Sequence, residues 1–218
     1  TKSNKNIIMS DESKIKIFRP FGPSLAKIQL SNEMIDNLNS HIDKIIENEK
    51  VSKKLDVGHN LAGNVKQEFY LEPEILESSG LLNLLASSTK KWIQFSQNME
   101  IKEFNIISSW VVRQFENEYN PVHYHSGHIS GVGYLKLPNN YGETVQSNKK
   151  KNLNGQLSLI HGSKMFNSES VCEIKPKVGD FYLFPNYLMH TVYPFYGKDE
   201  RRSLSFNAKI DEKIYNIS

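Results

Sequence analysis

The sequence predicts an α+β protein, mainly β, in which a β-sandwich or jelly-roll barrel follows N-terminal helices. Up to residue 101, apolar residues recur at the spacing typical of amphipathic helices; from residue 102 onward, short apolar runs alternate with turn residues. Hydrophobic residues make up 38% and charged residues 23% of the 218, a composition that supports a core and excludes a disordered or collagen-like chain. We expect a flexible leader at residues 1–14 and a single domain at residues 15–218.

Charge and cysteine content narrow the function classes. The chain has 27 Lys and Arg residues against 24 Asp and Glu residues, and this small excess does not indicate a nucleic-acid partner. Cys172 is the only cysteine, so an intramolecular disulfide or a cysteine-based metal site is excluded and a reducing, cytoplasmic location is favoured. No apolar run approaches the roughly 20 residues of a membrane span, so we expect no membrane partner.

The N-terminal part, residues 15–101, is predicted to be mainly helical. Residues 14–18 and 25–30 alternate around the two prolines of residues 19–23, a pattern typical of an edge strand or hairpin. Ser31 is a suitable N-cap for an amphipathic helix that ends in the charged stretch 47–54. Residues 81–97 form a second helical pattern, with Pro73 and Gly80 limiting helix between the two.

The later part, residues 102–210, is predicted to form the barrel. Its apolar runs are short, and turn sequences such as those at residues 138–142 and 177–180 separate them. Strands are expected at residues 106–115, 129–137, 156–160, 171–174, 181–184, 191–193 and 203–210. Seven or eight strands at this spacing indicate a β-sandwich or jelly-roll barrel.

Three histidines in this part are candidate metal ligands. His123 and His125 are two residues apart, so both imidazoles project from one face if residues 122–125 continue an extended strand. His190 ends an apolar strand and turn that would bury it. A lone buried histidine is usually a core residue, but together with the earlier pair it favours a metal site. Neutral imidazole suits Fe, Zn, Cu and Ni, so these ligands do not identify the metal.

A candidate carboxylate clamp follows at the last strand. Alternation places Arg201 and Ser203 on one face, together with Ser205 and Asn207. A planar guanidinium can bind both oxygens of a carboxylate while the hydroxyl adds a third donor. Arg201 and Arg202 can also be read as a solvated pair at the start of a strand.

The order of these parts resembles a known family. Residues 110–135 are similar to the N-P-x-H-x-H block, residues 175–190 to the K-P-x-x-G-D block and residues 200–207 to the E-R-x-S-x-S-F-N block of the 2-oxoglutarate- and iron(II)-dependent oxygenases found in phage and bacterial genomes. The resemblance covers roughly residues 102–210. It implies a double-stranded β-helix, a cupin-like jelly roll, that binds Fe(II) through His123 and His190 and 2-oxoglutarate through Arg201, with Ser203 beside it.

One position departs from the wider superfamily. His125 stands where those enzymes have an acidic ligand, as it does in the resembling subfamily, so it is either the third ligand or turns away and leaves the position to water or chloride. Tyr134 and Lys136 lie on the strand after the histidine pair, and this face of the strand can meet the co-substrate. Alternatively, Tyr134 packs in the barrel and Lys136 occupies a surface position. His128 is a weaker ligand candidate, and His41, His59 and His161 are not assigned to the site.

The leading hypothesis is therefore an Fe(II)- and 2-oxoglutarate-dependent dioxygenase that uses O2, hydroxylates a small or macromolecular substrate, and releases succinate and CO2. Two alternatives remain: an all-histidine, cupin-like metal dioxygenase or isomerase without a 2-oxo acid, and a non-catalytic jelly-roll binding domain. The sequence does not specify the substrate. Jelly-roll proteins often pair through strands or helices, which allows a homodimer.

Overall fold

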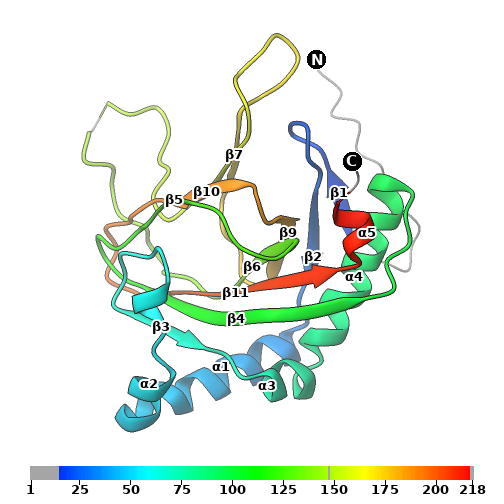
Figure 1. Ribbon diagram of the computed structural model, residues 1–218. Helices are drawn as coiled ribbons and strands as arrows, with labels where there is room; N and C mark the ends of the chain where they lie inside the picture. Colours follow the sequence, from blue (N-terminus) through cyan, green and yellow to red (C-terminus); the bar gives the residue numbers. More distant parts are fainter. Residues whose placement is uncertain (1–14, 147, 217–218) are drawn as a thin grey trace.

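Two antiparallel sheets form the centre of the computed structural model, which describes residues 15–146 and 148–216 (Figure 1). The larger sheet has the order β1 (Lys16–Phe18), β2 (Leu25–Gln29), β9 (Asp180–Pro185), β6 (Ile129–Lys136), β11 (Arg201–Ile210), β4 (Phe104–Gln114) and β3 (Gln67–Tyr70). The smaller sheet has the order β5 (Asn120–His123), β10 (Met189–Val192), β7 (Leu157–Ile160) and β8 (Val171–Ile174). The predicted jelly-roll fold is confirmed, whereas the expected leader at residues 1–14 lies outside the described residues.

Both predicted helices are present. They are α1 (Asn32–Glu47) and α4 (Leu81–Gln97), and the Ser31 hydroxyl caps α1 by accepting a hydrogen bond from the Met34 amide at 3.2 Å. The structure adds helices that the sequence pattern did not predict: α2 (Glu49–Leu55), α3 (Pro73–Ser78), the C-terminal α5 (Glu212–Tyr215) and a 3-10 turn at Gly58–Asn60. In the part of the chain that is described, no helix is both long enough and apolar enough to cross a lipid bilayer.

The first part of the chain also contributes strands to the larger sheet. β1 and β2 form the expected hairpin, and β1 lies at the sheet edge. β3, which was not expected, pairs with β4 at the opposite edge. Pro73, expected to limit helix, instead begins α3, because proline is well tolerated in the first helical turn.

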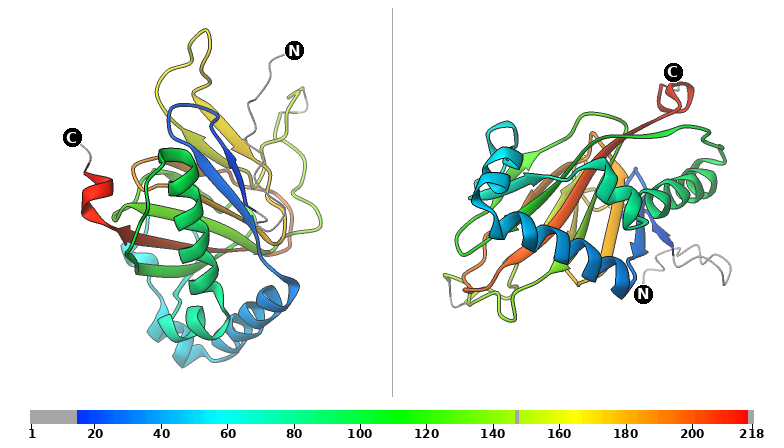
Figure 2. Two further views of the ribbon diagram at one scale, coloured as in Figure 1. Left: turned by 90° about the vertical axis from the view of Figure 1, so that its right-hand side faces the viewer. Right: turned by 90° about the horizontal axis from the view of Figure 1, so that it is seen from below.

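The larger sheet lies between the helices and the smaller sheet (Figures 1 and 2). Side chains on one face of β11, among them Leu204 and Phe206, pack in a core cluster with residues of α1 and α4 such as Leu38 and Leu85. Residues on the other face, Ser203 and others, line a cavity whose far wall is the smaller sheet. The period of two along a strand thus divides β11 between structural and cavity-facing positions.

A register shift separates Tyr134 from Lys136. Ser203 pairs with Tyr134 and Arg202 pairs with Lys136, so Leu135 is the extra residue of a bulge. Tyr134 therefore remains in the interior, while Lys136 is half-exposed and lies 3.4 Å from the Glu200 carboxylate. Lys136 occupies the surface position that the sequence left as one of its alternatives.

Candidate active site

A cavity between the two sheets contains all three candidate metal ligands. Its walls come from both sheets and from the segment before β3, and they include His123, His125, His190, Arg201 and Ser203. β5 and β10 are antiparallel neighbours in which His123 is directly opposite His190, so both side chains leave the smaller sheet on the same side. The sheet register therefore brings together two residues that are far apart in the sequence.

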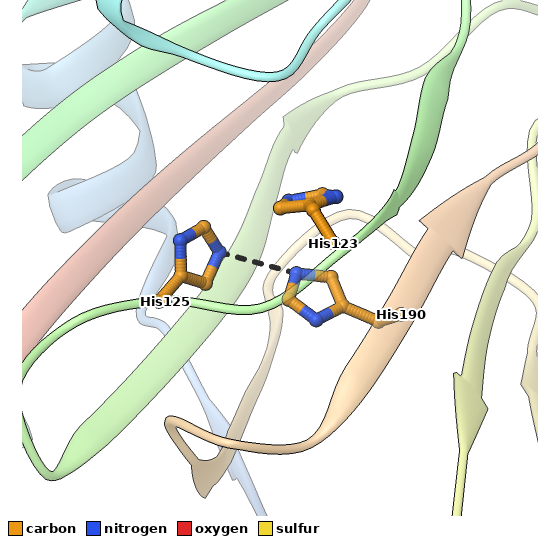
Figure 3. Close-up of side chains that lie close together, drawn as sticks. All are labelled: His123, His125 and His190. Carbon is orange, nitrogen blue, oxygen red and sulfur yellow. Dashed lines mark hydrogen bonds between the residues drawn. The ribbon is translucent and has the colours of Figure 1, made fainter.

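The three imidazoles face one another (Figure 3). One nitrogen from each ring lies within 4.8 Å of the others, and the Nε2 atoms of His125 and His190 are 3.1 Å apart. Two imidazole nitrogens that bind the same metal at about 2.1 Å lie roughly 3.0–3.4 Å apart for ordinary bond angles. The spacing of His125 and His190 thus fits two ligands of one ion.

Backbone carbonyls fix the tautomers of two of these rings. The Nδ1 atom of His123 lies 2.7 Å from the Pro121 carbonyl oxygen, and Nδ1 of His190 lies 2.8 Å from the Leu188 carbonyl oxygen. A carbonyl oxygen only accepts hydrogen bonds, so Nδ1 carries the proton in both rings and Nε2 presents a lone pair. This arrangement is typical of metal-binding histidines, whose second nitrogen is held by a backbone or carboxylate oxygen.

The environment keeps the cluster neutral. Burial lowers the pKa of His125 to about 3, with His190 and His123 lowering it further, and burial together with His123 lowers the pKa of His190 to about 4. Burial also lowers the pKa of His123, although its hydrogen bond to the Pro121 carbonyl opposes this. Neutral imidazole is the form that binds a metal ion, so near pH 7 the three rings are ready to do so without losing protons.

His125 reaches the cluster from a loop and not from a strand. β5 ends at His123, so the condition under which the sequence placed both imidazoles on one strand face is not met. The His125 amide instead donates to the Asn186 carbonyl at 3.0 Å, and the Asn186 side chain donates to the His125 carbonyl at 3.1 Å. These two hydrogen bonds hold the loop so that the His125 ring points toward His190. The sequence allowed His125 either to join the other two histidines or to turn away from them, and in the structure it joins them.

Arg201 lies buried in another part of the same cavity. Its Nε donates to the Gly155 carbonyl at 3.2 Å and its Nη1 to the Ser203 hydroxyl at 3.3 Å. Nη2 is buried and has no hydrogen-bond partner among residues 15–146 and 148–216. A buried guanidinium with a free donor is unfavourable unless an anion completes it.

A phenol lies beside this guanidinium. The ring of Tyr134 is 5.1 Å from the Arg201 guanidinium carbon, and its buried hydroxyl lacks a partner in the described part of the chain. Burial, partly opposed by the charge of Arg201, raises the pKa of Tyr134 to about 12, so the hydroxyl stays protonated and can donate. Arg201, Ser203 and Tyr134 thus assemble donors that suit a carboxylate.

Arg202 faces the other side of the sheet. Its guanidinium binds Asp43 and Asn39 of α1 at 2.7 and 2.9 Å, and its Nε lies 2.8 Å from Glu200. Glu200 also binds Arg113; although burial raises its pKa, these two arginines hold it at about 2. Arg202 therefore ties α1 to β11 and does not line the cavity.

The remaining histidines lie outside the cluster. His128 is buried, its Nδ1 accepts from the Ile210 amide at 3.1 Å, and its ring stacks on Tyr215. His41 is in α1 as expected, His59 is in the 3-10 turn, and His161 stacks on Phe21.

Two cavity residues were missed by sequence reasoning. Glu68 of β3 and Asn120 of β5 both line the cavity, and each has a buried side-chain oxygen without a partner among the described residues. The only signal for Glu68 is a carboxylate in the short run Gln67–Tyr70, which becomes informative once β3 is known to pair with β4.

Comparison with known proteins agrees with this geometry. Residues 108–207, which contain the histidine cluster and Arg201, match the family model described as "Putative 2OG-Fe(II) oxygenase". The matched region is that of a 2OG-Fe(II) oxygenase. No curated protein matches the chain.

Several solved structures share the fold of this chain. The viral collagen prolyl hydroxylase of Paramecium bursaria Chlorella virus-1, in complex with 2-oxoglutarate, has 18% identity and a TM-score of 0.53, covering 84% of this chain and 94% of the virus chain. AviO1 of Streptomyces viridochromogenes Tue57 has 14% identity and a TM-score of 0.58, covering 89% and 92%. HygX of Streptomyces hygroscopicus, with nickel and 2-oxoglutarate bound, has 10% identity and a TM-score of 0.53, covering 87% and 82%.

These findings confirm three predictions made from the sequence: the oxygenase family, the jelly-roll fold and the dioxygenase class. The description of the family model also names the predicted cofactors, Fe(II) and 2-oxoglutarate. The structural likeness, at 18% identity or below, establishes the shared fold alone. The roles of individual residues and the reaction are therefore argued from this chain's own geometry.

Proposed function

We propose that the protein hydroxylates an organic substrate, with 2-oxoglutarate converted to succinate and CO2. The observation that carries this proposal is that one cavity contains both three converging neutral imidazoles and a buried guanidinium with a free donor. A metal ion can bind the three imidazoles, and a carboxylate can accept the hydrogen bond from the guanidinium. The keto acid end and the distal carboxylate of 2-oxoglutarate provide a single molecule that meets both.

In this proposal His123, His125 and His190 hold Fe(II). The 3.1 Å approach of two Nε2 atoms supports the assignment, because His190 presents a lone pair there and this spacing fits two ligands of one ion. When bound, Fe(II) and 2-oxoglutarate supply the oxidising chemistry: O2 is consumed, the keto acid loses CO2, and an oxygen atom enters a C–H bond of the substrate. With three neutral ligands the site is one unit more positive than a site with two histidines and a carboxylate.

Arg201, Ser203 and Tyr134 are proposed to bind the distal carboxylate. The free Nη2 of Arg201 and the protonated hydroxyl of Tyr134 donate to its oxygens, and the Ser203 hydroxyl orients the guanidinium through its 3.3 Å contact with Nη1. Gly155 fixes the Nε side of the same guanidinium through its carbonyl. Binding therefore exchanges buried, unpaired donors for charge-assisted hydrogen bonds.

Succinate formation tests the proposal. The Fe(II)-loaded protein, incubated with 2-oxoglutarate in air, should release succinate and CO2 in amounts that depend on iron. Arg201→Ala should reduce this rate at least tenfold at low 2-oxoglutarate concentration, whereas the control Arg19→Ala, at an exposed residue, should not. Succinate formation that is unchanged in Arg201→Ala contradicts the assignment of this residue.

A second candidate is an all-histidine, cupin-like dioxygenase or isomerase that uses no 2-oxo acid. The observation in its favour is the composition of the cluster, in which every donor is an imidazole. It differs from the first proposal in one measurable respect, because conversion of its substrate would proceed with metal alone. The unpaired donor of Arg201 favours the first proposal.

A further inference from the structure

A short loop before β3 lines the same cavity as Arg201. Leu61, Ala62 and Gly63 of this loop line the cavity. The backbone of the next residue, Asn64, is paired with Tyr119 just before β5, with hydrogen bonds of 2.9 and 3.4 Å. The loop is thus held against the strand that carries His123.

Two acceptor oxygens meet beneath this loop. A Cβ atom placed on Gly63 would lie 2.5 Å from Oδ1 of Asn120 and 2.7 Å from Oε1 of Glu68, so the two oxygens lie within about 5 Å of each other. Glu68 is 1% exposed, and its Oε2 and the Asn120 Oδ1 are buried without a hydrogen-bond donor among the described residues. A side chain at position 63 would clash with both oxygens, so glycine is what lets the loop pack closely against them.

Among residues 15–146 and 148–216, no positively charged side chain pairs with these two oxygens. Burial, followed by the neighbouring carboxylates of Asp56 and Glu118, raises the pKa of Glu68 to about 7. Glu68 is also separate from the histidine cluster, because only the three imidazole nitrogens approach one another within 4.8 Å. An unpaired buried carboxylate is costly in its charged form, and a cation bound beside it would stabilise that form.

The remaining wall suits an alkyl chain with a cationic end. Trp110 contributes an aromatic surface next to His125, to which its ring is edge-on with centroids 5.4 Å apart. Leu61 and Ala62 add apolar surface from the loop. An aromatic ring attracts a desolvated cation, so Trp110 complements the two acceptors.

We propose that the substrate is an amine, bound as an ammonium ion that donates hydrogen bonds to Glu68 and Asn120 while its alkyl part lies along Trp110 toward the histidine cluster. This inference rests on the proposed function for the identity of the reaction. The acceptor pair itself stands on the geometry of β3, β5 and the loop. Glu68 and Asn120 would select substrates by charge, since an ammonium ion neutralises a buried carboxylate, a neutral analogue leaves its charge uncompensated and an anionic analogue is repelled by it.

The test measures thermal unfolding of the protein loaded with Mn(II) and 2-oxoglutarate under anaerobic conditions. The probes are n-butylammonium chloride, 1-butanol and sodium butyrate at matched ionic strength. Butylammonium should raise the melting temperature in a saturable way, whereas butanol and butyrate should not. Glu68→Gln should weaken butylammonium binding at least tenfold, Asn120→Asp should strengthen it, and the control Glu77→Gln, at an exposed residue of α3, should leave it unchanged.

Three outcomes would overturn the proposal: no saturable shift with butylammonium, an equal shift with butanol or butyrate, or unchanged binding in Glu68→Gln. The same experiment reports separately on the proposed function, because the shift caused by 2-oxoglutarate alone is measured before any amine is added. If 2-oxoglutarate shifts the protein and amines do not, only the amine proposal fails. If butylammonium binds through Glu68 while 2-oxoglutarate has no effect, only the oxygenase proposal fails.

Discussion

Replacing Glu68 by glutamine should stabilise the protein, and increasingly so as the pH rises. The pKa of this carboxyl is raised from 4.5 to about 7, so the folded state binds its proton more tightly than the unfolded state does. Folding stability therefore falls as the pH rises from about 4.5 to about 7 and stays at its lowest value above pH 7. Glutamine occupies the same space without a charge and avoids this loss.

The magnitude follows from the two pKa values. At about 1.4 kcal/mol for each tenfold change in proton affinity, the penalty in the wild type has an upper limit of about 3.4 kcal/mol above pH 7. Solvent that reaches the carboxyl through the cavity screens the charge, which reduces the expected gain to about 1–3 kcal/mol. For a chain of this length that corresponds to a rise in melting temperature of about 2–12 °C at pH 8.

The assay is urea or thermal unfolding of metal-free wild type and Glu68→Gln at pH 5, 6, 7 and 8. The histidines of the cavity titrate in both proteins, so the difference between them isolates Glu68. Glu77→Gln should stay within about 0.5 kcal/mol of wild type at every pH. A Glu68→Gln protein that is less stable than wild type at pH 8, or whose advantage is as large at pH 5 as at pH 8, would show that the charge of Glu68 does not destabilise the fold.

Three further substitutions distinguish residues that bind or position the metal or 2-oxoglutarate from residues that only stabilise the fold. Arg202→Ala should cost about 3 kcal/mol in unfolding free energy, because it breaks a buried ion pair, and should leave 2-oxoglutarate affinity within about twofold; the reverse pattern would identify Arg202 as the clamp. His125→Ala should lower Co(II) affinity at least about 100-fold in equilibrium dialysis, whereas the control His161→Ala should not lower it. Equal Co(II) affinity in the two variants would show that His125 is not a metal ligand. Asn186→Ala should lower Co(II) affinity about tenfold, because it frees the loop that holds His125. The control Tyr215→Phe removes only the 3.1 Å hydrogen bond from the Tyr215 hydroxyl to Asn186 and should lower the affinity less. A loss of stability with unchanged metal affinity would show that Asn186 does not position the ligand.

The elements predicted from the sequence are those whose signals are local. The helix after Ser31 has its cap and its apolar stripe within consecutive residues, and the structure has it at Asn32–Glu47. β3 could not be predicted in the same way, because four residues without clear alternation become a strand only through pairing with β4. The same limit applies to His125, whose orientation depends on Asn186, 61 residues later in the chain.

The site shows the same division. Spacing brought His123, His125, His190 and Arg201 to attention, and alternation along β11 correctly separated the face of Arg201 from that of Arg202. Alternation failed after Tyr134, where a bulge rotates Lys136 to the surface. Glu68 could not be identified from the sequence, because its burial and its unpaired oxygen arise only when β3, β5 and the loop before β3 come together.

The most direct test of the account is the stabilisation of the protein by metal and co-substrate together. Thermal unfolding is measured without oxygen in the presence of Mn(II), with and without 2-oxoglutarate, for wild type, Arg201→Ala and Arg19→Ala. Mn(II) should raise the melting temperature, and 2-oxoglutarate at 100 times its Kd should add about 2.7 kcal/mol, or about 5–11 °C. Arg201→Ala should lose the second increment and Arg19→Ala should keep it. If Mn(II) stabilises the wild type and 2-oxoglutarate adds nothing, the protein does not use this co-substrate and the assignment as a 2-oxoglutarate-dependent oxygenase is wrong.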